Sequence, residues 1–121
     1  MAEVARLAAD GAPEGTVVVA EEQTAGRGRI GRPWESARYA GLWFSILLRP
    51  PREPAELGWL PLLVGTAVAT SLREATGVSA CLKWPNDVVH IGDGDPGKLG
   101  GILAERLPDG AVVVGVGVNV L

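Results

Sequence analysis

The sequence has little of the chemistry that cysteine and histidine provide, because its 121 residues include only Cys81 and His90 of these types. A single cysteine excludes an internal disulfide and any metal site made of several cysteines, and it is typical of a reducing compartment. We interpret Cys81 as a small core residue, and His90 as a solvent-facing strand residue rather than a catalytic base. We therefore expect a cytoplasmic protein whose function depends on other side chains.

Long apolar runs and a net positive charge are missing as well. The first ten residues have neither the basic start nor the apolar core of a secretory signal. The most apolar segment, residues 57–72, is interrupted by Pro61 and Gly65 and falls short of the roughly 20 residues that span a bilayer. The formal net charge of −3 argues against a surface built throughout for nucleic acid. We expect no membrane attachment, and any site for an anion must be local.

What is present predicts a single α+β domain with one long and one short helix. Hydrophobic residues make up 47% of the chain and charged residues 21%, which is ordinary globular composition. Apolar spacing predicts helices at residues 2–10 and 55–76, the second ended by Gly77 in the left-handed conformation. Apolar runs between turn residues predict a buried strand at 16–20 and further strands at 42–48, 80–84, 88–91, 99–106 and 111–118. We expect a mixed or largely antiparallel sheet, with Trp43 and Trp59 in the core.

A basic, glycine-rich segment is the most informative part of the chain. Between Gln23 and Arg38 there are four arginines and one acid, and residues 22–41 have no regular periodicity. Glycines in this segment let the backbone approach a ligand, arginines can form paired hydrogen bonds with phosphate or carboxylate, and Trp34 could cover an aromatic base. A long loop that binds an anion is one interpretation. A flexible basic loop, or an RNA-binding arginine–glycine segment, fits these residues about as well.

Two further segments combine polar residues with turns. Lys83 to Asp87 reads KWPND, and Asn86 and Asp87 are oxygen ligands suited to Mg²⁺ beside ATP phosphates, although a plain turn is the simpler explanation. Residues 92–98 match the spacing of a phosphate-binding P-loop up to the lysine, but Leu99 replaces its serine or threonine, and two aspartates would repel phosphate. We interpret them as an exposed acidic turn that delivers Lys98 to the start of a strand.

The last two strands carry unusual glycines. Lys98 stands at the start of a predicted strand, from which its side chain could reach into a pocket, and Gly100 and Gly101 would leave room for a ligand against the backbone. A solvated lysine beside a strand bulge explains the pattern equally well. Residues 114–119 alternate valine with glycine, which predicts a strand with one valine face and one face of bare backbone. Such a face can form the floor of a pocket, with Asn119 bonding a purine edge, or it can pack closely against a helix.

Taken together and in this order, these segments resemble the catalytic domain of biotin–protein ligases over nearly the whole chain. Four motifs carry the resemblance: GRGRxGRxW at 26–34, KWPND at 83–87, KLGGIL at 98–103 and GVGVN at 115–119. The resemblance implies the biotin/lipoate ligase fold, a class II synthetase-like core. It also implies that biotin and MgATP give biotinyl-adenylate and pyrophosphate, and that a lysine of a biotin carboxyl carrier domain then attacks the mixed anhydride.

The resemblance assigns roles to individual residues. Lys98, Arg27 and Arg29 are the expected catalytic cations, because Lys98 matches the lysine that contacts the reacting carboxylate and the α-phosphate. Asn86 and Asp87 match the metal and ATP region. The full set expected to bind substrate or nucleotide comprises Gln23, Gly26, Arg27, Gly28, Arg29, Arg32, Trp34, Lys83, Asn86, Asp87, Lys98, Gly101, Ile102, Gly115 and Asn119.

The resemblance also sets the expected extent and partners of the chain. Residues 1–121 should form one catalytic domain that is incomplete at both ends, because the family's Ser-Thr pair that meets the biotin ring would lie just before Met1, and the elements after Asn119 are missing. Without an N-terminal DNA-binding domain no DNA binding is expected, whereas a homodimer is compatible with the family.

Two alternatives stay open. A lipoate–protein ligase shares the fold and the adenylate chemistry, although GRGRIGR and KWPND fit the biotin branch better. An inactive fragment, or a nucleic-acid-binding module that uses the arginine loop, is the alternative from a different class.

Overall fold

The computed structural model describes residues 1–34, 37–51, 54–92, 94 and 97–120, so residues 93, 95 and 96 of the acidic turn predicted at 92–98 lie outside the described residues. The two helices are α1 (Ala2–Ala9) and α2 (Leu60–Thr76), and short 3₁₀ segments span Arg29–Gly31 and Pro54–Trp59. The strands are β1 (Val17–Ala20), β2 (Gly41–Leu48), β3 (Ala80–Lys83), β4 (Asp87–His90), β5 (Gly97–Arg106) and β6 (Val112–Asn119). Within the described residues, no helix is long and apolar enough to span a membrane.

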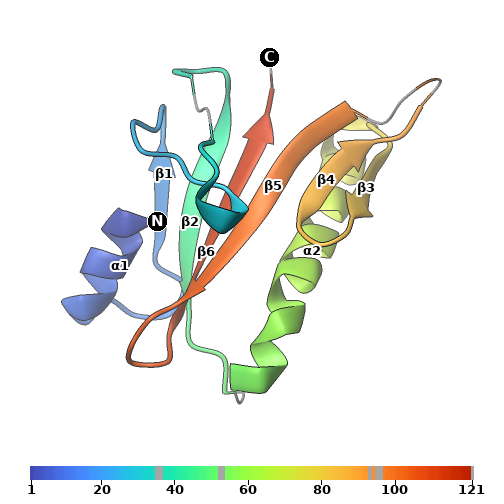
Figure 1. Cartoon of the computed structure of the whole chain (residues 1–121). Helices are drawn as coiled ribbons and strands as arrows, with labels where there is room; N and C mark the ends of the chain where they lie inside the picture. Colours follow the sequence, from blue (N-terminus) through green and yellow to red (C-terminus); the bar gives the residue numbers. More distant parts are fainter. Residues whose placement is uncertain (35–36, 52–53, 93, 95–96, 121) are drawn as a thin grey trace.

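All described strands join one antiparallel sheet in the order β1-β2-β6-β5-β4-β3. Figure 1 shows α1 beside β1 and β2, and α2 beside β3, β4 and β5. The predicted α+β class, with one short and one long helix, is therefore confirmed, and the sheet is antiparallel throughout.

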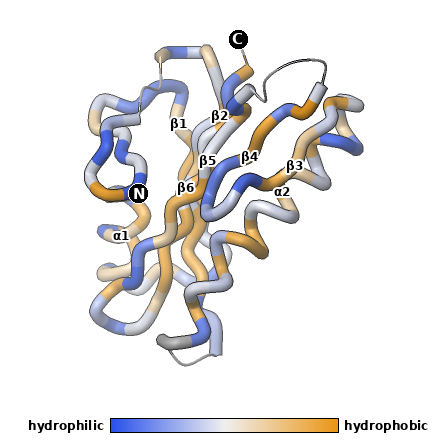
Figure 2. Tube along the Cα trace, turned by 45° about the vertical axis from the view of Figure 1, so that its right-hand side comes forward, coloured by the Kyte–Doolittle hydropathy of each residue, from blue (hydrophilic) through white to orange (hydrophobic). Residues whose placement is uncertain are grey.

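The alternation of side chains along β6 explains why the two helices cover opposite faces of the sheet. Val114 and Val116 pack in the cluster that includes Ala69 of α2, whereas Val113 packs with Val4 of α1. Successive side chains of a strand point to opposite faces, so these two clusters lie on the two sides of the sheet. Figure 2 shows the hydrophobic colour concentrated along the central strands, between the more hydrophilic loops.

The ends of α2 follow from its sequence. Pro61 lies in the first turn, where its missing N–H is not needed. Gly77 ends the helix with φ 75° and donates its N–H to the Arg73 carbonyl at 3.0 Å. The left-handed conformation predicted at Gly77 is thus confirmed.

Some predictions of burial were wrong. The strand predicted as buried at 16–20 is an edge strand, and Val17 and Val19 are 48% and 63% exposed because no helix or strand of the described residues covers their face. Trp59 is 68% exposed rather than in the core. It precedes the first turn of α2 and so lies outside the helix stripe that packs on the sheet. Trp43 is 2% exposed and His90 is exposed, both as predicted. Cys81, predicted to be a core residue, is only half-buried.

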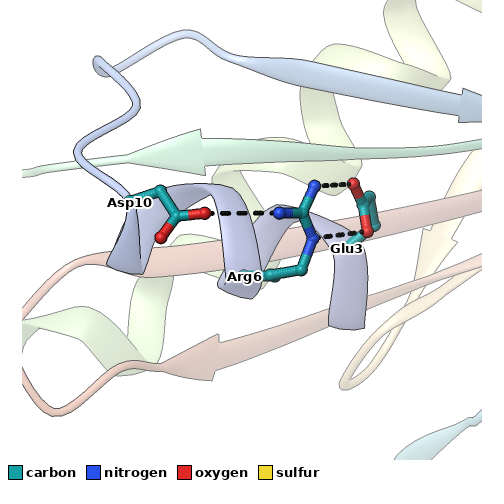
Figure 3. A network of polar contacts seen from close by, with 3 residues as sticks. All are labelled: Glu3, Arg6 and Asp10. Atoms are coloured by element: carbon teal, nitrogen blue, oxygen red, sulfur yellow. Dashed lines mark hydrogen bonds and ion pairs between the residues drawn. The ribbon is translucent and has the colours of Figure 1, made fainter.

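The outer surface of α1 carries an ion-pair network that Figure 3 shows. Arg6 donates Nε to the Glu3 carboxylate at 3.1 Å and Nη1 to Asp10 at 3.3 Å. The hydrogen bond from Arg6 lowers the pKa of Glu3. Because these side chains are exposed, water and salt screen the pairs, and they contribute little to stability.

Close packing between β5 and β6 predicts a difference between two glycines of the same strand. A Cβ added at Gly100 would lie 2.2 Å from the backbone oxygen of Gly117, whereas one at Gly97 would meet nothing within 4 Å. We expect Gly100→Ala to lower the free energy of unfolding by about 1–3 kcal/mol, as overpacking does. Gly97→Ala is the matched control and should change it little.

Urea denaturation followed by circular dichroism measures both variants. Equal stability of the two would contradict the described packing of β5 against β6.

Candidate active site

A cavity of about 510 Å³ opens on the face of the sheet that α1 partly covers. The loop between β1 and β2 lies over β5 and β6 on this face, as Figure 1 shows. Twelve of the residues predicted from the sequence line the cavity: Gln23, Arg27, Gly28, Arg29, Arg32, Trp34, Asn86, Asp87, Lys98, Gly101, Ile102 and Gly115. Segments far apart in the chain therefore converge on one space.

The floor of the cavity consists of two neighbouring rows of residues across the sheet. The first, which we call the Gly115 row, runs from Ser45 through Gly115 to Leu103. The second, the Gly117 row, includes Gly117 and Gly101, which are partners in β6 and β5. Bare backbone at the glycines leaves depth for a ligand, and the predicted bare face of β6 is thus present.

Side chains of the chain itself cover both rows. The Trp34 ring lies over the Gly117 row, since a Cβ at Gly117 would be 3.0 Å from Nε1 of its indole. That indole N–H is buried without a hydrogen-bond partner among the described residues. The thioether of Met1 covers Gly115, where a Cβ would lie 2.8 Å from Sδ. A ligand must therefore slide beneath these two side chains or displace them.

Lys98 lies at the edge of the cavity as a result of a strand irregularity. The pairing of β4 with β5 shifts between Val88 and Val89, which oppose Gly100 and Lys98, so Leu99 is an extra residue in β5. Such a bulge reverses the face of the residues before it. Lys98 Nζ consequently lies 3.2 Å from Oδ1 of Asp87 and 4.8 Å from the centre of the Trp34 ring.

The turn between β3 and β4 holds Asn86 and Asp87 against β5. Asn86 donates its side-chain amide to the Ile102 carbonyl at 2.9 Å, and Ile102 donates its N–H to the Asn86 carbonyl at 2.9 Å. The amide of Asn86 thus has a structural partner, and the carboxylate of Asp87 faces Lys98. In the described part of the chain, no group of three or more histidine, cysteine, aspartate or glutamate residues could hold a metal ion.

The arginine loop folds into a small hairpin. Trp34 donates its N–H to the Gly26 carbonyl, and Arg32 donates to the Arg29 carbonyl at 3.2 Å. The two residues at its tip, Ile30 and Gly31, have φ of 58° and 68°, which is the backbone of a type I′ turn. The left-handed conformation is unfavourable for a β-branched residue, by roughly 1–2 kcal/mol, so the hairpin is strained at Ile30.

The charges around the cavity are mostly positive. Arg29 and Arg32 make no ion pair with a described residue, whereas Arg27 donates to Glu105 at 2.9 Å. Burial lowers the pKa of the Met1 α-amino group, while the charge of Glu105 raises it and that of Arg27 lowers it. With Lys98, three arginine side chains face a space that contains few carboxylates, as an anion site requires.

Three of the predicted residues do not line the cavity. Lys83 is exposed at the end of β3, and Asn119 is exposed at the end of β6, where it pairs with Gly41. Gly26 packs instead against the loop backbone, because a Cβ there would lie 2.3 Å from the Trp34 carbonyl oxygen. Their assignment to the site remains a prediction.

Ser45 and Leu103 line the cavity and were not predicted from the sequence. The signal for Ser45 was present, since it is a lone polar residue within the apolar strand 42–48. No comparable signal distinguishes Leu103 from a core leucine.

Relatives of known sequence match most of the chain. The profile of the biotin/lipoate A/B protein ligase family matches residues 4–120. The bifunctional ligase/repressor BirA of Bacillus subtilis is 43% identical over 114 residues, covering 94% of this chain and 35% of BirA. The biotin–[acetyl-CoA-carboxylase] ligase of Mycobacterium tuberculosis is 44% identical, covering 97% of this chain and 44% of that ligase. The chain therefore spans less than half the length of these relatives.

Solved structures agree with the sequence matches. The biotin protein ligase of Leishmania major in complex with biotinyl-5-AMP superposes with a TM-score of 0.81 at 27% identity, covering 98% of this chain and 52% of that one. The ligase of Aquifex aeolicus gives a TM-score of 0.68 at 36% identity over 96% of this chain. Both share the fold described above, and the chain belongs to the biotin/lipoate A/B protein ligase family.

Proposed function

We propose that this chain is the catalytic core of a biotin–protein ligase, which joins biotin to AMP and transfers it to a lysine of a biotin carboxyl carrier domain. The observation that carries the proposal is the convergence of Lys98 and the loop arginines on one glycine-floored cavity. The relatives named as biotin ligases, and the Leishmania ligase that binds biotinyl-5-AMP, support it.

The first step brings two anions together. The biotin carboxylate attacks the α-phosphorus of ATP, a carbon–oxygen–phosphorus anhydride forms, and pyrophosphate leaves with the bonding electron pair. Positioned cations lower this barrier, because they offset the repulsion between reactants and the charge that develops on the phosphoryl oxygens. Lys98 is the cation for the reacting carboxylate, and it exchanges its partner Asp87 for the substrate.

The second step transfers biotin to the acceptor. The uncharged amine of the acceptor lysine attacks the carbonyl carbon of the mixed anhydride, AMP leaves, and an amide forms. Water would destroy the anhydride in the same way, so the site must exclude it between the two steps. The arginine loop and Trp34, which already cover the Gly117 row, are the elements that do so.

Mg²⁺ would supply charge neutralisation for the phosphates of ATP. The described residues fit an ion that arrives with the nucleotide, because Mg²⁺ is usually held by one or two carboxylates together with phosphate oxygens and water. Asp87 provides one carboxylate at the cavity edge, and Asn86 lies next to it. The roles of both residues toward Mg²⁺, a homodimer, and a cytoplasmic location are parts of the same proposal.

The choice between biotin and lipoate is the first test. We expect the chain, with MgATP, to release pyrophosphate when biotin is added and not when lipoate is added, because the GRGRIGR and KWPND segments fit the biotin branch. A coupled phosphate assay measures the release. Release with lipoate alone would overturn the proposal in favour of the lipoate branch.

The second test concerns Lys98. Lys98→Ala should slow adenylate formation by about 100- to 1,000-fold, the size of effect expected when a charge-stabilising group is removed. Arg106→Ala removes a positive charge from the opposite end of β5 and serves as the matched control. Single-turnover formation of biotinyl-adenylate from labelled ATP measures both variants, and a near-normal rate for Lys98→Ala would remove this lysine from its role.

A further inference from the structure

Ser45 is a buried polar residue to which the proposed chemistry gives no role. It is 4% exposed, the one polar residue among those described to be so buried. It lies in the middle of β2, and its neighbours on the same face, Trp43 and Leu47, are 2% and 0% exposed. An alanine or valine would be expected at such a position.

The hydroxyl of Ser45 has no hydrogen bond to any residue that the structure describes. The buried side-chain nitrogen and oxygen atoms that lack a partner among the described residues are the indole nitrogens of Trp34 and Trp43, so the Ser45 hydroxyl is not fully enclosed. Ser45 pairs across the sheet with Gly115, which has no side chain to cover it, and it lines the cavity. Its hydroxyl is therefore available to a bound molecule.

The position of Ser45 relative to Lys98 indicates which part of a molecule it would meet. Ser45 on β2 shares its row with Gly115 and Leu103, whereas Lys98 is five residues away from Leu103 along β5. The two backbones are therefore separated by about 10 Å across the sheet and by about 15 Å along the strands. An acid whose carboxylate lies at Lys98 would extend along the floor toward the Gly115 row. In biotin, the end remote from the carboxylate is the bicyclic ring, which carries a ureido group and a thioether.

We infer that Ser45 recognises the ring of bound biotin through a hydrogen bond from or to its hydroxyl, an inference that rests on the proposed function. The ureido group offers a strong acceptor oxygen and two N–H donors, and the thioether sulfur is a weak acceptor. Ser45 thus distinguishes this substrate from acids with a purely apolar tail, because only a polar ring offers its hydroxyl a hydrogen-bond partner.

Substitution by alanine tests the inference on the chain as it stands. Ser45→Ala should weaken biotin binding roughly 3- to 10-fold, the value of one hydrogen bond, and leave the melting temperature unchanged or raised. Ser71→Ala is the matched control, since the Ser71 hydroxyl is exposed on α2 and bonds the Ala67 carbonyl. Titration calorimetry with biotin, and thermal denaturation, measure the three proteins.

Desthiobiotin, which keeps the ureido ring and lacks the sulfur bridge, identifies the ring atom. Equal weakening of biotin and desthiobiotin by Ser45→Ala supports a bond to the ureido group, and weakening of biotin alone supports a bond to sulfur. Unchanged affinity for both ligands overturns the role of Ser45 and leaves the proposed function intact. Failure of the unsubstituted chain to bind biotin would instead overturn the proposed function, and the inference with it.

Discussion

Gly101, Gly115 and Gly117 leave part of one face of β5 and β6 without side chains, and the rest of the site depends on that gap. A sheet face normally buries its residues against a helix, but α1 covers only the end of this face near Val113. Trp34 and Met1 cover part of the remaining face and line the cavity. Trp34 lies against the backbone of Gly101 and Gly117, whereas Met1 also packs against the cluster that contains Val4 and Leu47.

Two of the cations at the site form ion pairs with carboxylates of the chain itself. Lys98 is paired with Asp87 and Arg27 with Glu105, and the side chains of both pairs are partly exposed. Exposed pairs of this kind contribute little to stability, so a substrate anion can replace either carboxylate at small cost. Arg29 and Arg32, without ion pairs among the described residues, add to the attraction for phosphate.

The sheet holds its site residues in fixed positions, whereas the arginine loop can change conformation. Lys98, Asp87 and Asn86 lie on or beside paired strands, which fix their positions before any ligand arrives. The arginine loop, in contrast, has a strained Ile30 at its tip and a buried indole N–H, that of Trp34, which has no partner among the described residues. Both features raise the free energy of this loop conformation, which favours a change of conformation when a ligand supplies new hydrogen bonds.

The sequence by itself determined the elements and most of the site. The end of α2 at Gly77, the bare face of β6 and the cationic loop all follow from local pattern, because turn residues and apolar periodicity act over a few neighbours. Only the tertiary structure decided which face each residue occupies. The extra residue Leu99 turns Lys98 toward the cavity, β1 is an exposed edge, and Ser45 faces Gly115. The register of the strands, and which faces other elements cover, depend on contacts between segments that are distant in the sequence. A short-range sequence pattern carries no information about those contacts.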